Sequence, residues 1–581
     1  MSAIKQTNGA PSPRLHEVSN QRTDKEVDES TARIQSQLRL LQADDVAQIG
    51  KKRQVQGTLL TAGFNHWIMT FANVKLYLHY LVATWSSYLL GVTSGKLCFR
   101  DAVAVVIWTL WTSISLGSMF GMCAIGTLPP VIWLWKLFNG NIGLVNANIP
   151  HFFESLSPEL ANAAKEKLSA PADPKAYNPR TFDLDIAAFM LQISAIMYER
   201  DPKGTNRAVQ DAQARSNTVP IDRKELGGEE VEKKTAPDEP GAVVGALFTR
   251  RDADHIIDLL DAGAVESEAP IRKFVKRYEL QFAVVSELQT TSQAYCSLFW
   301  EPRGKWVVVA FKGTDPTSFE EWSTGFTTTF VDSARDIPGF KYLHEGFKER
   351  VLPAEGRQPY YTIAAAVKVV CEELVKGHDK GTKINVWFTG HSLGTAMGSI
   401  TYAKALVAKD DFGPHALIRD AYCFATPVVC DIKSRLFFNS VMSRDTKTPR
   451  TLWRITNRND FVATGIPDFG DRRVEGYGAD NMFNFSHLGV EIFMKDHPTP
   501  SQVAGDAVRA PSGFEVHVTS KFDAFAWKAM RDDLKKKGYV QPFYITWLQY
   551  IPVLGSMAAH GTTNYWEQLH RVGLMPAVAR E

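Results

Sequence analysis

The C-terminal part of the chain alternates between short apolar runs and segments with apolar residues at helical spacing. Five apolar runs predict buried strands, at 294–301, 306–312, 383–390, 419–429 and 451–460. The turn PRGK joins the first two into a hairpin, and helices are expected over 393–409 and between the last two strands. Such alternation predicts an α/β fold with a mostly parallel sheet and helices on both faces.

A second pattern, an almost uncharged stretch, lies nearer the N-terminus. Between 54 and 135 formal charge falls only on Lys75, Lys96, Arg100 and Asp101. A helix over 102–125 is long enough to cross a ~30 Å hydrocarbon core, and 76–95 is a second candidate. We therefore expect residues 54–138 to be a helical membrane-anchoring region. A buried helical hairpin in a soluble protein is the alternative interpretation.

The flanks of this region suggest an orientation. Two passes, or one re-entrant hairpin broken at the Pro pair 129–130, would leave both flanks on the same side. The basic run at 51–53 favours a cytosolic N-terminal flank. We expect a cytosol-facing domain on a membrane, the endoplasmic reticulum or a lipid droplet.

The remaining segments differ in composition. Residues 1–53 are polar and charged and are expected to be a disordered tail, with a short helix near 34–46. Residues 139–181 are interpreted as a linker to a domain over 182–581. That domain begins with a core helix at 182–201 and carries a flexible insertion at 202–241, which lacks aromatic residues.

Composition excludes some classes of function. The 65 Lys and Arg residues nearly balance 63 Asp and Glu, so the net charge of +2 gives no basic excess for nucleic acid. The six Cys residues show no metal-binding spacing, and we expect neither a metal nor an organic cofactor. The oligomeric state is not predicted.

One candidate nucleophile stands between a predicted strand and a predicted helix. Ser392 lies in Gly390-His391-Ser392-Leu393-Gly394. A tight strand-to-helix turn requires very small residues two positions before and after the nucleophile, as found here. Such a turn would expose the serine hydroxyl and leave the Leu393 N–H free to stabilise an oxyanion. A glycine-rich packing turn with an idle serine is the alternative.

A serine nucleophile needs a base and an orienting acid, in the order Ser, Asp, His for an α/β-hydrolase. Asp460 ends a predicted strand, at the same sheet edge as the elbow; Asp468, Asp431 and Asp420 are weaker candidates. For the base, His560 precedes a helix in a loop, whereas His487 lies in a strand-like segment. We favour His560 and keep His487 as the alternative.

Together these motifs resemble the class 3, or fungal-type, lipase family. VVVAFKGT, LHEGF, VWFTGHSLG, YCFATPVV and WRITNRNDFVATGIP occur in the family's order over roughly 285–570. The resemblance implies an α/β-hydrolase fold, hydrolysis of glycerolipid esters, and a triad of Ser392, Asp460 and His560. It also implies that Thr314 and Leu393 form the oxyanion hole. Ala425 and Val428 depart from the family pattern, which usually carries Gly and Arg there.

The segment between Thr314 and LHEGF occupies the position of the family's lid. Phe319, Trp322, Phe326 and Phe330 could form an apolar face on a short helix that covers the site or binds lipid. An ordinary amphipathic surface helix is the alternative. We thus expect a membrane-anchored serine lipase whose partners are a glycerolipid substrate and a lipid surface. A phospholipase A1, an acyltransferase and a non-catalytic scaffold remain open.

Overall fold

The computed structural model describes the larger part of the chain in separate stretches. They are residues 23–50, 75, 77–79, 81–95, 152–171, 180–200, 267–286, 296–313, 330–354, 358–444, 450–457, 460–464, 484–494, 508–511, 514, 516–518 and 552–572, with scattered positions in 102–146 and at 258 and 262. The predicted insertion at 202–241 lies outside these residues.

An eight-stranded sheet forms the centre of the fold, in the order β13-β12-β10-β8-β7-β4-β3-β2. Strands β4, β7, β8, β10 and β12 pair in parallel, and β2, β3 and β13 pair antiparallel. Their bounds are β2 (Gln281–Ser286), β3 (Cys296–Trp300), β4 (Trp306–Phe311), β7 (Ile384–His391), β8 (Ala416–Phe424), β10 (Leu452–Asn457), β12 (Val490–Met494) and β13 (Val508–Arg509). The mostly parallel sheet confirms the predicted α/β fold.

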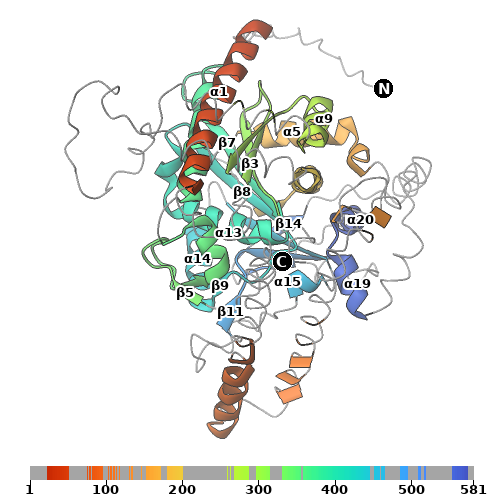
Figure 1. The fold of residues 1–581 in the computed structure, drawn as a ribbon. Coiled ribbons are helices and arrows are strands. Elements are labelled where there is room, and N and C mark those ends of the chain that lie inside the picture. The colour runs from red at the N-terminus through yellow and green to blue at the C-terminus, as the bar shows by residue number, and fades with distance from the viewer. Residues whose placement is uncertain are drawn as a thin grey trace, which may run out of the picture.

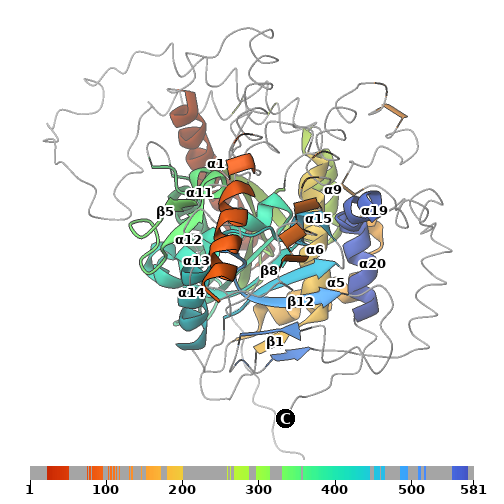
Figure 2. The same cartoon turned by 90° about the horizontal axis from the view of Figure 1, so that it is seen from below.

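Helices cover both faces of this sheet, as Figures 1 and 2 show. One face packs against α11 (Glu345–Val351), α12 (Pro359–Val375), α13 (Leu393–Val407) and α14 (Ile432–Arg444). The other packs against α5 (Pro158–Ser169), α6 (Leu184–Ile196), α9 (Ala269–Arg277) and α20 (Thr562–Val572). Val307 and Val309 point into the first core, and Val308 into the second. Burial on both faces explains why the strands appear in the sequence as continuous apolar runs.

The N-terminal segment differs from the disordered tail expected over 1–53. Helix α1 (Asp24–Gly50) buries Ile34, Leu38 and Leu41 in the core beside α12 and β2. Gln35 Nε2 donates a hydrogen bond to the carbonyl of Phe282 on edge strand β2, at 3.0 Å. The expectation of disorder was wrong for 24–50, because these apolar residues dock an otherwise polar helix, whereas the predicted short helix near 34–46 lies within α1.

The segment expected to be a linker, 139–181, also contributes to the core. The 3₁₀ turn η1 (Phe152–Glu154) and helix α5 bury Phe152 and Leu168 beside α6. Strand β1 (Arg180–Phe182) pairs in parallel with β14 (Val516–Val518). The folded domain therefore starts earlier than 182, because these apolar side chains complete the second core. Helix α6 lies where the core helix was predicted, and the 3₁₀ turn η2 (Met197–Glu199) follows it.

A smaller antiparallel sheet lies beside the main one, in the order β11-β9-β6-β5. Its strands are β5 (Phe330–Asp332), β6 (Tyr342–His344), β9 (Cys430–Asp431) and β11 (Phe485–Ser486). Three short elements complete the described fold: η3 (Lys409–Phe412), α15 (Phe461–Thr464) and α19 (Pro552–Ala559).

The described residues of the predicted membrane region are helical at 81–93 and at positions between 102 and 117. Tyr88 packs with Val105, and the hydroxyls of Tyr77 and Ser113 are hydrogen-bonded at 2.9 Å. These pairings make the two helical stretches antiparallel, as in a hairpin. No helix within the described part of the chain is both long enough and apolar enough to cross a membrane. Membrane insertion of 54–138 stays a prediction.

Candidate active site

The candidate nucleophile stands on a strained turn between β7 and α13. Ser392 has φ 58° and ψ −133°, a region that non-glycine residues rarely adopt. A Cβ atom on Gly394 would lie 2.4 Å from the carbonyl oxygen of Phe311, and one on Gly390 would lie 3.0 Å from Gly394. A side chain would clash with the backbone at Gly394 and would be tightly crowded at Gly390, which explains why the sequence surrounds Ser392 with glycine.

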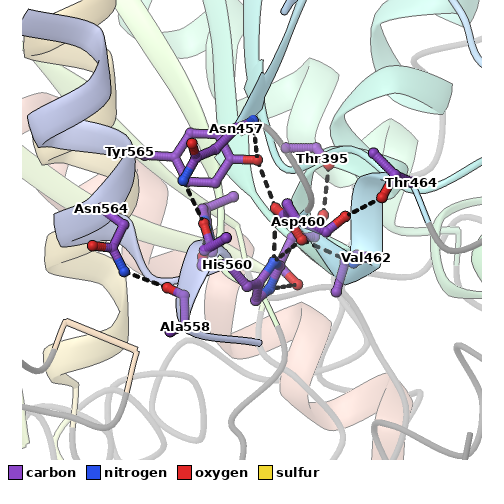
Figure 3. A network of polar contacts seen from close by, with 12 residues as sticks. Thr395, Asn457, Asp460, Val462, Thr464, Ala558, His560, Asn564 and Tyr565 are labelled. Atoms are coloured by element: carbon purple, nitrogen blue, oxygen red, sulfur yellow. Dashed lines mark hydrogen bonds and ion pairs between the residues drawn. The ribbon is translucent and has the colours of Figure 1, made fainter. Parts of the chain in front are cut away.

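The structure brings the three predicted triad residues into one hydrogen-bonded relay. Figure 3 shows His560 and Asp460 with their neighbours. Nε2 of His560 is 2.8 Å from Oγ of Ser392. Nδ1 of His560 is 2.9 and 3.1 Å from the two carboxylate oxygens of Asp460. A carboxylate only accepts, so Nδ1 carries the proton and Nε2 is left to accept the proton of the serine hydroxyl.

Asp460 is fully buried and lies just beyond the end of β10. One oxygen accepts the Val462 N–H at 2.8 Å, and the other accepts the hydroxyl of Tyr565 at 2.6 Å. Burial alone would raise the pKa of the Asp460 carboxyl. The neighbouring His560 and the hydrogen bonds outweigh burial and lower this pKa below its usual value. The carboxylate therefore stays ionised and can hold an imidazolium.

The alternative candidates lie elsewhere or outside the described residues. The Asp420 carboxylate accepts bonds from the Thr451 amide and the Trp453 indole. Asp431 binds the amides of Tyr342 and Ser434 in the small sheet. Asp468 is not among the described residues. It is the ring of His560, not that of His487, that bridges the acid and the serine.

The structure describes the predicted oxyanion-hole residues and the predicted lid residues only in part. Leu393 is the first residue of α13, where a backbone N–H has no acceptor within the helix. Thr314 lies outside the described residues, but Gly313 before it abuts the nucleophile turn: a Cβ atom there would be 2.5 Å from the carbonyl of His391. Of the proposed lid residues, Phe319, Trp322 and Phe326 also lie outside the described part. Phe330 begins strand β5, so its placement on a lid helix was wrong: it pairs with His344 on β6.

Several residues at the site escaped the sequence analysis. Tyr565, one turn into α20, binds Asp460, and its hydroxyl also accepts the N–H of Asn457 at 3.0 Å. His391 is fully buried beside Ser392, and its Nδ1 is 2.9 Å from the hydroxyl of Tyr198. Only the position of His391 next to the nucleophile could have suggested a role.

The described residues contain no group of three or more His, Cys, Asp or Glu side chains arranged to hold a metal ion. What the site offers is a serine with an adjacent base and a buried acid. This arrangement can transfer an acyl group through an acyl-enzyme.

Comparison with known proteins agrees with this geometry. The family profile of lipase (class 3) matches residues 308–469, which include Ser392 and Asp460. This segment of the chain is similar to class 3 lipases. The triacylglycerol lipase OBL1 of Arabidopsis thaliana is 21% identical over 255 residues, which are 39% of this chain and 44% of that protein. The chain thus spans less than half the length of this curated relative.

Solved structures of lipases are also similar, at low TM-scores. The lipase of Rhizopus microsporus var. chinensis is 19% identical, covering 39% of this chain and 66% of that one, with a TM-score of 0.27. The Rhizomucor miehei lipase propeptide complex is 18% identical, covering 41% and 65%, with a TM-score of 0.27. His560 and Tyr565 lie outside the segment matched by the family profile, so the class 3 lipase assignment and the base rest on separate observations.

Proposed function

We propose that this chain is a serine lipase that hydrolyses fatty-acyl esters of glycerolipids, namely tri-, di- or monoacylglycerols. The observation that carries the proposal is the relay in which His560 contacts Ser392 at 2.8 Å and Asp460 at 2.9 Å. The similarity to class 3 lipases supports glycerolipid esters as the substrate class.

Acylation starts when Ser392 Oγ attacks the ester carbonyl carbon while its proton moves to Nε2 of His560. The carbonyl oxygen becomes an oxyanion, which the Leu393 N–H and Thr314 are proposed to bind. Losing one such donor typically costs ~3 kcal/mol of transition-state stabilisation. Asp460 stabilises the imidazolium formed in this step.

The tetrahedral intermediate collapses when the bond to the glycerol oxygen breaks. His560 gives its proton to that oxygen, and the glycerol-containing product leaves a fatty-acyl ester on Ser392. Water then attacks this ester while His560 takes one of its protons. A second collapse returns the proton to Ser392 and releases the fatty acid.

The test is fatty-acid release from emulsified triacylglycerol by the purified full chain. Ser392→Ala should lower the rate by at least about a thousandfold. Ser399→Ala is the matched control, since Ser399 lies buried on α13, the helix that follows Ser392, and its hydroxyl contacts Cys423 instead. Equal rates for wild type and Ser392→Ala would refute the proposal. Ester formed on an added alcohol or lysolipid would identify a transferase, and activity only on phospholipid would identify a phospholipase.

We further propose that residues 75–117 bind the surface of a membrane or lipid droplet, with the catalytic domain in the cytosol. Their helices expose apolar side chains to solvent: Leu90 is 70% exposed, and Leu89, Val103 and Leu110 are also more than half exposed. Figures 1 and 2 place the helix of 81–93 (orange to brown) on the side of the molecule that also carries α15, which follows Asp460. A lipid surface bound there would hold substrate near the site.

Flotation of the full chain with phospholipid vesicles or triacylglycerol droplets tests this surface. Leu89→Glu with Leu90→Glu should greatly reduce the floated fraction, because both side chains would carry charge into the lipid. Leu40→Glu on α1, also an exposed leucine, is the matched control. Unchanged flotation of the double variant would contradict the proposed surface.

A further inference from the structure

The turn that carries the base is held through its backbone. Residues 558–560 are the last two residues of α19 and the first residue of the turn into α20, and each of their three successive carbonyl oxygens accepts a hydrogen bond from a side chain. The donors are Nδ2 of Asn564 for residue 558, Nδ2 of Asn457 at 2.8 Å for residue 559, and Nε2 of His391 at 2.8 Å for residue 560. They come from α20, from the end of β10 and from the end of β7 (Figure 3 shows the two asparagines).

The contact made by His391 fixes its own tautomer. Because Nε2 faces a carbonyl oxygen, it must carry a proton, and neutral Nδ1 then accepts the hydroxyl of Tyr198. Burial, aided by the nearby His560, lowers the pKa of His391 to about 3. His391 therefore remains a neutral donor over the ordinary pH range. It cannot serve as a second base, since its acceptor nitrogen faces Tyr198.

The side chain of Asn457 also donates a hydrogen bond to this turn. Its side chain is buried, Nδ2 donates to the carbonyl of Ala559, and Oδ1 has no hydrogen-bond partner among the described residues. A leucine of similar size would fill the same space but could not donate to the turn, so the bond from Nδ2 to Ala559 is what the asparagine adds at this position.

We propose that His391, Asn457 and Asn564 are positioning residues that fix the base through the three carbonyls of 558–560. This inference rests on the proposed lipase function. The imidazole of His560 must present one nitrogen to Ser392 and the other to Asp460 at the same time. A shift of the turn by a fraction of an ångström would lengthen one of these contacts. Misplacement of a catalytic group by about 1 Å costs about a hundredfold in rate.

Tyr198, which contacts His391, lies before residues 308–469, the segment matched by the family profile. Its hydroxyl also lies against Gly313, where a Cβ atom would be only 1.8 Å away. One residue of the 3₁₀ turn after α6 thus contacts both the donor to the base and the chain leading to Thr314. The N-terminal part of the domain is therefore a component of the site.

The experiment measures the rate constant for labelling by a fluorophosphonate probe, with the final extent of labelling reporting the folded fraction. His391→Phe removes the donor and should slow labelling roughly tenfold to a hundredfold at an unchanged extent. His391→Gln restores an N–H donor of similar reach and should label within about threefold of wild type. Asn457→Leu should behave like His391→Phe. His344→Phe, which replaces another buried histidine outside the triad, should leave the rate unchanged.

The outcomes separate this inference from the proposed function. If the wild type does not label at Ser392, the lipase proposal fails. If the wild type labels and His391→Phe labels equally fast, or if His391→Gln is as slow as His391→Phe, the positioning role is overturned. Should His391→Phe fail to fold, the Asn457→Leu rate decides in the same way.

Discussion

Replacing Tyr565 by Phe tests how the buried acid is stabilised. The hydroxyl of Tyr565 donates to Asp460 at 2.6 Å and accepts the N–H of Asn457 at 3.0 Å, in a fully buried environment. The substitution removes only this oxygen and keeps the ring between Phe424 and His391. Two buried polar groups would lose a partner at once.

The magnitude follows from these two bonds. A hydrogen bond to a charged group contributes about 1.5–3 kcal/mol, and a stranded buried N–H costs about 1–3 kcal/mol. We expect Tyr565→Phe to lower the free energy of unfolding by about 3 kcal/mol. Tyr402→Phe is the control: its buried hydroxyl makes one bond, to the carbonyl of Arg419 at 2.9 Å, and its loss should cost about 1 kcal/mol.

The assay is urea unfolding at pH 7, followed by tryptophan fluorescence, and repeated at lower pH. Since the pKa of Asp460 is lowered in the folded state, its ionisation stabilises the fold above about pH 4 and that contribution is lost as the pH falls further. Without the Tyr565 donor the folded-state pKa rises, so stability should depend less on pH below about 4. Equal destabilisation by Tyr565→Phe and Tyr402→Phe would refute this account of the acid.

Three further predictions concern the elbow, the N-terminal helix and buried histidines. Gly394→Ala should abolish labelling by the fluorophosphonate because its Cβ atom would lie 2.4 Å from a backbone oxygen, whereas Gly117→Ala, where no atom of the described residues lies within 4 Å, should label normally. Leu38→Ala should lower the free energy of unfolding by about 3 kcal/mol, because Leu38 is 1% exposed. Leu40→Ala should change it by less than about 0.5 kcal/mol, because Leu40 is 45% exposed. Similar values for the two variants would exclude docking of α1. Burial lowers the pKa of His344, like that of His391, to about 3. As the pH falls below about 6.5, both histidines become protonated in the unfolded chain while they stay neutral in the folded chain. Each histidine should cost about 2 kcal/mol of stability between pH 7 and pH 5, and His344→Phe should halve the combined loss; an unchanged pH slope would contradict this.

The sequence predicted the parts of the site that depend on local pattern. Ser392 was found because a strand-to-helix turn demands small residues on either side. Asp460 was found because parallel strands end at one edge of the sheet. His560 required the chain order Ser, Asp, His and the family resemblance, because its loop has no pattern of its own.

The parts that the sequence did not predict depend on single contacts between distant residues. Tyr198 and His391 are 193 positions apart, and no periodicity connects them. Tyr565 and Asn457 are ordinary residues in their own elements and gain a role only when α20 meets the end of β10. For helix α1 the sequence predicted a short helix near 34–46 but not its docking, which depends on contacts of Ile34, Leu38, Leu41 and Gln35 with distant parts of the chain.

The most direct test of the central claim is to identify, by peptide mass spectrometry, the residue that a fluorophosphonate modifies in the full chain. The account predicts modification at Ser392, lost in His560→Ala and kept in His487→Ala. Modification of another residue, or labelling that persists in His560→Ala and disappears in His487→Ala, would contradict the triad of Ser392, His560 and Asp460.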